Sequence, residues 1–240
     1  MTAPPQTIHV PLASRSYDIR IGTGNLDTVG SFLTSLGKTS HAVLITDENV
    51  RTPHAETVAA SLAEAGVQVD MIVVDPGEAS KSVDMAAGLW EGLLQVGADR
   101  KTVVVAVGGG VVGDLAGFIA ATFARGVRFF QAPTTLLAQV DSSVGGKVGI
   151  NLPEAKNMVG AFKQPMGVLI DTATLDTLPD REYRAGLAEV VKYGVILDAD
   201  FFTQLENSAD AINRHEAEIL VQVIAHCCRL KAEVVAQDET

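Results

Sequence analysis

Three glycines at a fixed spacing are the first residues in this sequence that could do chemistry. Gly108, Gly110 and Gly113 form the pattern G-x-G-x-x-G between the apolar run Val103–Val107 and a further apolar stretch. Glycines after a buried strand let backbone N–H groups approach a pyrophosphate, and the N-terminus of the following helix favours negative charge. The pattern favours a dinucleotide-phosphate site over a tight structural turn.

The acidic residue that normally follows such a fingerprint is missing. About 20 residues later the chain reads Arg128–Pro133, which contains no Asp or Glu. Asp47 and Glu78 follow two earlier strand-like segments, and ligands of open α/β sheets bind at the carboxyl ends of strands. These two carboxylates are therefore the candidates for holding the ribose of NAD.

A second polar cluster follows the next strand. The segments Pro133–Thr135 and Asp141–Lys147 bring hydroxyls, a carboxylate, glycines and an ammonium into a short span. Such a loop could hold phosphate and ribose oxygens, with Lys147 supplying charge, or it could be an ordinary surface turn. The segment alone leaves both alternatives open. Lys156 and Asn157 are expected in a further loop, where lysines are usually solvated surface residues. They become candidate site residues only together with the polar segments above.

A helix in the last third of the chain carries a candidate metal ligand. On the helix expected over 181–195, Glu182, Glu189 and Lys192 share one face. An exposed salt-bridged stripe is the commoner arrangement, and catalytic zinc needs about three protein ligands. The histidines form no H-E-x-x-H pattern, and the neighbours His226–Cys228 point too far apart on a helix to bind one ion. Glu189 is thus a candidate for one ligand only.

Alternating strand and helix patterns would position these groups. After a hairpin over 8–12 and 17–21, strands are expected at 41–46, 67–74, 102–107, 128–132 and 167–170, with helices at 26–36, 55–65, 83–96 and after the glycine pattern. Apolar strands separated by helices indicate a mostly parallel sheet covered on both faces, a Rossmann-like α/β fold. Only helical periodicity follows, at 181–195, 200–208 and 214–235. We therefore expect an NAD-binding α/β domain at 1–178 and the start of an all-helical metal and substrate domain at 179–240.

Composition restricts the function classes. The 240 residues are 47% hydrophobic and carry a net charge of −11, so the chain can bury a large core and repels nucleic acid and anionic membranes. Residues 115–170 are locally basic, with five Lys and Arg against two Asp and Glu, which suits a small anionic ligand. Two adjacent cysteines form no disulfide framework, and no segment looks like a leader or a membrane span. We expect a cytoplasmic protein.

Taken together, these segments resemble the 3-dehydroquinate synthase family along nearly the whole chain. The ordered motifs that carry the resemblance are Thr46–Val50, Gly77–Lys81, Gly108–Asp114, Phe123–Arg128, Pro133–Lys147, Gly149–Asn151, Lys156–Phe162, Leu175–Pro179 and Gly186–Lys192. The resemblance implies a homodimeric metalloenzyme of the shikimate pathway that binds NAD⁺. Its reaction would convert 3-deoxy-D-arabino-heptulosonate 7-phosphate into 3-dehydroquinate and phosphate.

The resemblance also implies roles for individual residues. The implied NAD⁺ contacts are Asp47, Asn49, Gly77, Glu78, Lys81, Gly110, Val111, Val112, Gly113, Asp114, Thr134, Thr135, Thr174, Leu175, Asp176 and Thr177. The implied substrate contacts are Arg125, Asp141, Asn157 and Lys192, with Lys147 and Lys156 between cofactor and substrate. Glu189 would be one ligand of a zinc or cobalt ion.

The family places its two histidine zinc ligands after the point where this chain stops. We therefore expect a fragment of a longer enzyme, inactive by itself, rather than a chain that has lost activity. Three alternatives stay open. They are a cyclase that uses another heptulose phosphate or glucose 6-phosphate, a metal-dependent polyol dehydrogenase, and a noncatalytic NAD-binding module.

Overall fold

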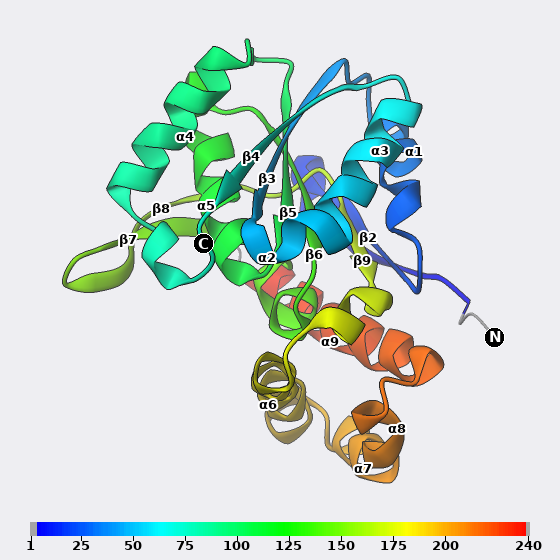
Figure 1. Ribbon diagram of the computed structural model, residues 1–240. Coiled ribbons are helices and arrows are strands. Elements are labelled where there is room, and N and C mark those ends of the chain that lie inside the picture. Colours follow the sequence, from blue (N-terminus) through cyan, green and yellow to red (C-terminus); the bar gives the residue numbers. More distant parts are fainter. Residues whose placement is uncertain (1–3, 239–240) are drawn as a thin grey trace.

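A mostly parallel sheet forms the centre of the computed structural model, which describes residues 4–238. Within this range, seven strands run in the order β1-β2-β9-β6-β5-β3-β4, and only β1 and β2 pair antiparallel. Their bounds are β1 Gln6–Val10, β2 Tyr17–Gly22, β3 His41–Asp47, β4 Gln68–Val74, β5 Val103–Gly108, β6 Arg128–Pro133 and β9 Val168–Asp171. The Rossmann-like α/β fold and the expected strands are confirmed (Figure 1), except that the first strand spans Gln6–Val10 and not 8–12.

The strand order reverses between β3 and β5. From β3 the chain first adds β4 on one side, and it then returns to place β5 on the other side. In an open α/β sheet such a switch point leaves a crevice at the carboxyl ends of the two strands. Asp47 ends β3 and Gly108 ends β5, so the glycine pattern and a candidate ribose carboxylate lie at the same crevice.

Alternating side chains on the strands bury both faces of the sheet. Helices α1 (Val29–Ser35) and α3 (Glu56–Glu64) cover the face that carries Leu44 and Val105. Helices α4 (Val83–Gln95) and α5 (Gly110–Thr122) cover the opposite face, as Figure 1 shows. Because strand side chains alternate with period two, a run such as 103–107 must be apolar throughout to fill both layers.

Local sequence sets the ends of these helices. Ser82 caps α4 by accepting a hydrogen bond from the N–H of Met85, and Gly97 follows the helix with a φ of 71°. Gly66 ends α3 in the same left-handed conformation, with a φ of 79°. Only glycine adopts this conformation without strain, so the expected stops at these glycines are confirmed.

A two-stranded hairpin stands apart from the main sheet. Strands β7 (Lys147–Leu152) and β8 (Ala155–Phe162) pair antiparallel, and β7 packs against α5. The expectation of loops at Lys147 and at Lys156–Asn157 was therefore wrong: these residues lie on β7 and β8. The hairpin was missed because β8 is mostly exposed and lacks the alternation that marks a half-buried strand.

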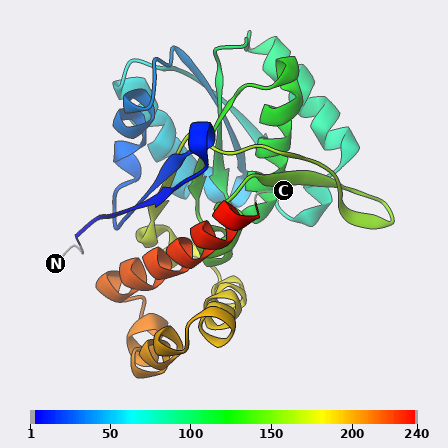
Figure 2. The ribbon, with the colours of Figure 1, turned by 180° about the vertical axis from the view of Figure 1, so that it is seen from behind.

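The remaining chain is helical, as expected from its periodicity. It forms α6 (Asp180–Leu197), α7 (Ala199–Asn207), α8 (Ala209–Asn213) and α9 (Ala217–Gln237). Helix α9 lies along β1 behind the sheet, and its apolar face shares one core with β1, β2 and β9 (Figure 2). The last helix starts later than expected because the chain turns at His215, whose φ is +55°.

Two further features bear on the sequence expectations. Cys227 and Cys228 are buried free thiols on α9, and burial raises the pKa of Cys228 to about 12. Among the described residues, no helix combines the length and the apolar character needed to cross a bilayer.

Candidate active site

The glycine turn between β5 and α5 packs tightly against the segment that follows β6. A Cβ atom on Gly109 would lie 2.9 Å from Thr135 Cγ2, and one on Gly110 would lie 3.0 Å from Ser142 Oγ. No side chain caps the N-terminus of α5, and its first turn holds no acidic residue. The free N–H groups and the helix dipole at this turn can therefore receive an anion.

Asp47 lies beside this turn, at the end of the neighbouring strand. Its Oδ1 atom accepts hydrogen bonds from the N–H groups of Asn49, at 2.9 Å, and Val50, at 3.2 Å. Burial raises the pKa of the Asp47 carboxyl, and these two hydrogen bonds oppose the shift. The carboxylate is thus fixed at the crevice where the ribose was expected.

A buried ion pair joins the segment after β4 to α5. Lys81 has a side-chain exposure of 4%, and its Nζ atom lies 2.6 Å from Asp114 Oδ2 and 2.5 Å from Asn157 Oδ1. Burial raises the pKa of Asp114, and the Lys81 ammonium opposes that shift. Three segments that are far apart in sequence are therefore fixed to one another here.

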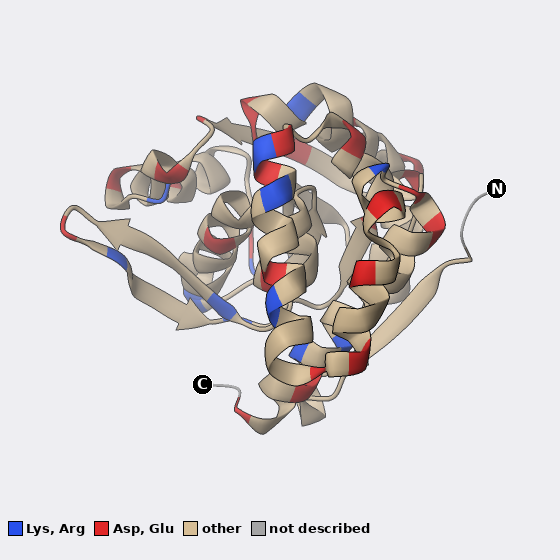
Figure 3. Cartoon of the chain, turned by 90° about the horizontal axis from the view of Figure 1, so that it is seen from below, with Lys and Arg blue, Asp and Glu red and all other residues tan. Residues whose placement is uncertain are grey.

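The hairpin is attached to the same segment by amides. Asn151 Nδ2 donates to Glu78 Oε1 at 2.8 Å, and the N–H of Asn157 donates to Asn151 Oδ1 at 2.8 Å. Asn157 adopts a left-handed φ of 56°, which asparagine tolerates better than most residues. Lys156 Nζ lies 3.9 Å from Glu78 Oε1 and its side chain is 77% exposed. Figure 3 shows Lys and Arg positions, coloured blue, along the hairpin.

A pocket of about 560 Å³ opens between the hairpin, α5 and α9. Its charged and amide lining residues include Asp114, Asp141, Lys147, Asn157 and Lys231. Lys147 is exposed and forms no ion pair with any residue of the range 4–238. The pocket thus presents one unpaired ammonium close to the glycine turn, which suits an anionic ligand.

Lys231 and Tyr193 belong to this site, although sequence reasoning missed both. Lys231 Nζ lies 2.7 Å from Asp141 Oδ1, and the Tyr193 hydroxyl donates to the carbonyl of Val140 at 3.0 Å. Burial raises the pKa of Tyr193, and the charge of Asp141 adds to the shift. The available signal was positional: Lys231 interrupts the buried stripe of α9, three residues after Cys228.

Glu189 and Lys192 lie on α6 and pair with each other. Their contact, together with the nearby Asp141, raises the pKa of Lys192. No group of three His, Cys, Asp or Glu side chains gathers anywhere between residues 4 and 238. His226, also on the helical part, instead pairs with Asp198 at 2.9 Å. The residues present therefore do not complete a metal site, and Glu189 offers one carboxylate.

Arg125 lies away from the pocket. It is exposed in the turn between α5 and β6, and it is absent from the pocket lining. Ala124 and Arg125 adopt left-handed φ values of 50° and 67°, which cost energy for residues other than glycine. Within a single chain the structure therefore does not bring Arg125 to the other candidate substrate residues.

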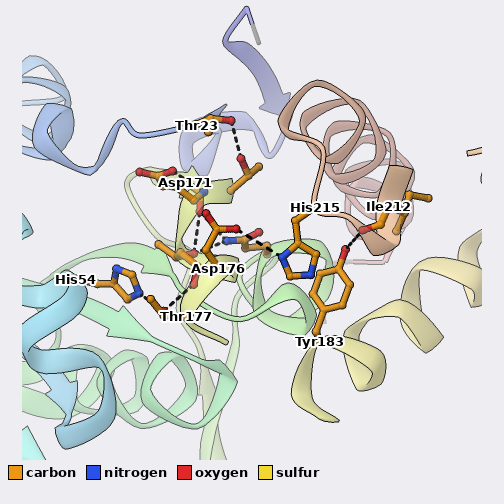
Figure 4. A network of polar contacts seen from close by, with 12 residues as sticks. Thr23, His54, Asp171, Asp176, Thr177, Tyr183, Ile212 and His215 are labelled. Atoms are coloured by element: carbon orange, nitrogen blue, oxygen red, sulfur yellow. Dashed lines mark hydrogen bonds and ion pairs between the residues drawn. The ribbon is translucent and has the colours of Figure 1, made fainter. Parts of the chain in front are cut away.

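The turn after β9 holds the last group of expected NAD⁺ contacts (Figure 4). Thr177 donates its hydroxyl proton to the carbonyl of Thr174, so His54 Nε2 donates to Thr177 Oγ1 at 2.7 Å. Asp176 is exposed and lies 3.6 Å from His215 Nδ1. Thr174 and Leu175 are buried. This turn is therefore held between the sheet layer, through His54, and the helical part, through His215.

Comparison with known proteins gives the family. A model described as 3-dehydroquinate synthase N-terminal matches residues 71–185, and one described as 3-dehydroquinate synthase C-terminal matches residues 186–240. The 3-dehydroquinate synthase of Rhodopirellula baltica is 51% identical over 245 residues, covering 100% of this chain and 65% of the relative. The chain belongs to the 3-dehydroquinate synthase family. The 3-dehydroquinate synthase of Desulforamulus reducens is 51% identical over 233 residues, and this match covers 97% of this chain. The chain spans about 65% of the length of these relatives.

Solved structures of other proteins share the fold of this chain, and some of them also share part of its sequence. A 2-deoxy-scyllo-inosose synthase complexed with carbaglucose-6-phosphate, NAD⁺ and Co²⁺ has a TM-score of 0.88 and 30% identity, covering 98% of this chain and 63% of that one. A 2-epi-5-epi-valiolone synthase from Streptomyces hygroscopicus with NAD⁺ and Zn²⁺ has a TM-score of 0.85 and 28% identity, covering 95% and 64%. A Schizosaccharomyces pombe glycerol dehydrogenase, 20% identical with a TM-score of 0.68, shares the fold over 88% of this chain and 58% of its own.

Proposed function

We propose that the complete protein is a 3-dehydroquinate synthase, which converts 3-deoxy-D-arabino-heptulosonate 7-phosphate into 3-dehydroquinate and phosphate. The observation that carries the proposal is the pocket where Lys147, Asp141 and Asn157 converge beside the glycine turn. Relatives that are 51% identical over nearly the whole chain and have this name support it. The proposed place of the reaction is the shikimate pathway, in the cytoplasm.

The residues around the glycine turn fit NAD⁺. Gly109 and Gly110 keep the turn free of side chains, and the buried hydroxyl of Thr134 has no hydrogen-bond partner within the described range 4–238. Asp47 and Glu78 at neighbouring strand ends offer carboxylates to a ribose. We propose that these residues and the first turn of α5 hold the dinucleotide. When bound, NAD⁺ would accept a hydride from a secondary alcohol of the substrate and later return it.

The charged residues of the pocket fit the substrate anion. Lys147 forms no ion pair among residues 4–238, so its ammonium is free to stabilise a phosphate as that group leaves with its negative charge. Lys231 is already engaged by Asp141, and it therefore fixes that carboxylate against the pocket wall. Asn157 is held by Lys81 and Asn151, which orients it toward the same space. Ring closure after phosphate loss needs orientation more than further acids.

We also propose a divalent metal ion, zinc or cobalt, for the complete protein. Solved relatives contain Co²⁺ or Zn²⁺, and Glu189 would supply one carboxylate ligand. Because residues 4–238 do not complete a metal site, we assign no step of the reaction to the metal. The division into domains at residue 178 likewise stays a prediction.

A homodimer is the proposed assembly. Arg125 was expected at the substrate, yet it lies outside the pocket of its own chain, in a strained exposed turn. Strained backbone is commonly retained where it serves a ligand, so the Arg125 side chain is expected to contact one. A second copy of the chain is the simplest source of a pocket for this guanidinium. Equilibrium sedimentation of the wild type and of Arg125→Ala measures the assembly. The kinetics of the same two proteins measure the role of the side chain.

The alternative function is a cyclase acting on a different sugar phosphate. Identity to the solved 2-deoxy-scyllo-inosose synthase is 30%, against 51% to the 3-dehydroquinate synthases, which favours the latter. This choice is tested by the turnover of two substrates by the full-length gene product. The substrates are the heptulosonate phosphate and glucose 6-phosphate, each with the other as competitor.

Phosphate release by the full-length gene product, supplied with NAD⁺ and zinc, tests the function itself. We expect stoichiometric phosphate and no net NADH, because the hydride returns to the substrate. Accumulating NADH would instead indicate a polyol dehydrogenase. NAD⁺ binding with no phosphate release from the full-length product would indicate a noncatalytic module.

A further inference from the structure

Gln139 lies at the centre of a buried polar network behind the proposed dinucleotide site. Its side chain is 0% exposed, in the wide helical turn Ala138–Ser142 that follows β6. The Nε2 atom donates toward the carbonyls of Pro133, at 3.2 Å, and Asp171, at 3.1 Å. It also donates toward Thr174 Oγ1 at 3.0 Å. One amide therefore contacts the ends of β6 and β9 and the turn after β9.

The acceptors around Gln139 fix the orientation of its amide. Turning the amide over would place Oε1 against two carbonyl oxygens, which cannot donate. In the observed orientation Oε1 is buried and has no hydrogen-bond partner among residues 4–238, which is unfavourable. A buried unpaired acceptor in a native fold calls for a compensating role, and the donors of the same amide supply one.

The partners of Gln139 are themselves held. The Asp171 carboxylate accepts from the N–H groups of Gly24, at 2.7 Å, Asn25, at 2.7 Å, and Leu26, at 3.1 Å. It also accepts from the N–H of Ala173 at 2.9 Å. Figure 4 shows Asp171 near Thr23 and above the turn that carries Asp176 and Thr177. The carbonyl that Gln139 binds is thus anchored in a rigid loop.

The backbone of Gln139 extends the network to two further segments. Its N–H donates to the carbonyl of Thr135 at 2.9 Å, and its own carbonyl accepts from Cys228 Sγ at 3.3 Å. Cys228 lies on α9, the helix that carries Lys231 to the pocket. Gln139 is absent from the pocket lining, so it acts on the site only through other residues.

We infer that Gln139 is a positioning residue: it holds the segments 133–135 and 171–177 at a fixed separation and ties both to α9. The inference rests on the proposed NAD⁺ function, because the two segments carry Thr134, Thr135 and Thr174–Thr177. Removing the amide donors takes this donor from the Pro133 carbonyl and leaves the Asp171 carbonyl and the Thr174 hydroxyl only the hydrogen bond that they make with each other, so each strand end is then free to shift.

NAD⁺ binding to Gln139→Met and Gln139→Glu, measured by calorimetry on the full-length gene product at pH 8 and pH 6, tests the inference. Methionine keeps the volume but loses both donors, so we expect binding at least about tenfold weaker at both pH values. Glutamate at this position would face carbonyl oxygens, which raise its pKa. We expect it to bind weakly at pH 8 and to recover at pH 6, where the protonated acid donates again. The exposed Gln95, changed in the same two ways, is the matched control.

Amide hydrogen exchange without NAD⁺ separates this inference from the proposed function. In Gln139→Met we expect faster exchange in 133–135 and 171–177 and unchanged exchange in β3. If the wild type fails to bind NAD⁺ but this local change occurs, the cofactor proposal fails and the positioning role stands. Wild-type affinity in the folded variants, or loosening spread evenly over the chain, would overturn the inference.

A milder pair of variants covers the case in which Gln139→Met does not fold. Cys228→Ala removes the donor to the Gln139 carbonyl, whereas Cys228→Ser retains a donor of similar size. We expect faster exchange in 133–142 for the alanine variant and near wild-type exchange for the serine variant. Equal exchange in the two variants would overturn the tie to α9.

Discussion

The ammonium of Lys81 and the carboxylate of Asp114 form a largely buried ion pair, 2.6 Å apart, that holds the segment after β4 against the second turn of α5. Asn157 of the hairpin completes the contact at 2.5 Å. The pair thus fixes to one another three segments that border the proposed dinucleotide site and the substrate pocket.

Lys81→Met is expected to destabilise the fold by about 1–3 kcal/mol, because it leaves the Asp114 carboxylate, which is 22% exposed, without its cation. Urea unfolding of the 240-residue chain measures the loss. Lys156→Met, which changes a side chain that is 77% exposed, should shift stability by less than about 0.5 kcal/mol. A loss for Lys81→Met as small as that of the control would show that the pair contributes little.

Lys147→Ala is expected to weaken the handling of the anionic substrate far more than it disturbs folding, because Lys147 is exposed and forms no ion pair among residues 4–238. In the full-length product we expect kcat/KM to fall by at least about 100-fold, a barrier change of about 2.7 kcal/mol. The matched control is Lys38→Ala, an exposed lysine before β3. An unchanged kcat/KM would contradict the proposed role of this ammonium.

Gly186→Ala should separate α6 from the turn that precedes the pocket. The new Cβ would lie 2.6 Å from Leu136 Cβ and 2.7 Å from the backbone nitrogen of Leu137, so the helix must move. We expect a loss of about 1–3 kcal/mol, from overpacking. Gly88→Ala on α4, where nothing lies within 4 Å, should instead stabilise by up to about 1 kcal/mol. Thermal unfolding of both variants decides the point, and equal shifts would contradict the close packing.

The stability of the chain should depend on His54 in mildly acidic solution. Burial lowers the pKa of His54 below its ordinary value of 6.5. Between that value and the lower folded pKa the unfolded chain binds more protons, so stability falls as the pH drops through this window and is constant above it. His54→Gln should remove this part of the pH dependence, whereas the exposed His9→Gln should retain it. Urea unfolding at a series of pH values measures both, and parallel curves for wild type and His54→Gln would refute the prediction.

Sequence periodicity was sufficient for the main sheet and its covering helices, because buried strands such as 103–107 and glycine stops such as Gly97 leave strong local patterns. It failed for the hairpin, since the exposed β8 has no core to pattern it. The glycine fingerprint located the turn correctly, and strand ends indicated where Asp47 would lie.

The pocket itself could not be assembled from local patterns. The contact between Lys231 and Asp141 joins a late helix to a turn 90 residues earlier, and no spacing rule connects them. Arg125 shows the opposite limit, because a resemblance gives a residue a role without saying from which chain it acts. The proposed metal site would need ligands that residues 4–238 do not supply.

Helix α9 has a consequence for the order of events during synthesis. The first strand ends at Val10 and leaves the ribosome early, but the helix that covers β1 and β2 begins only at Ala217. Until α9 is made, the apolar side of the β1–β2 pair stays exposed to solvent or to a chaperone. Packing between segments so far apart in the sequence slows folding. Nascent chains halted before and after α9 should therefore differ sharply in resistance to protease.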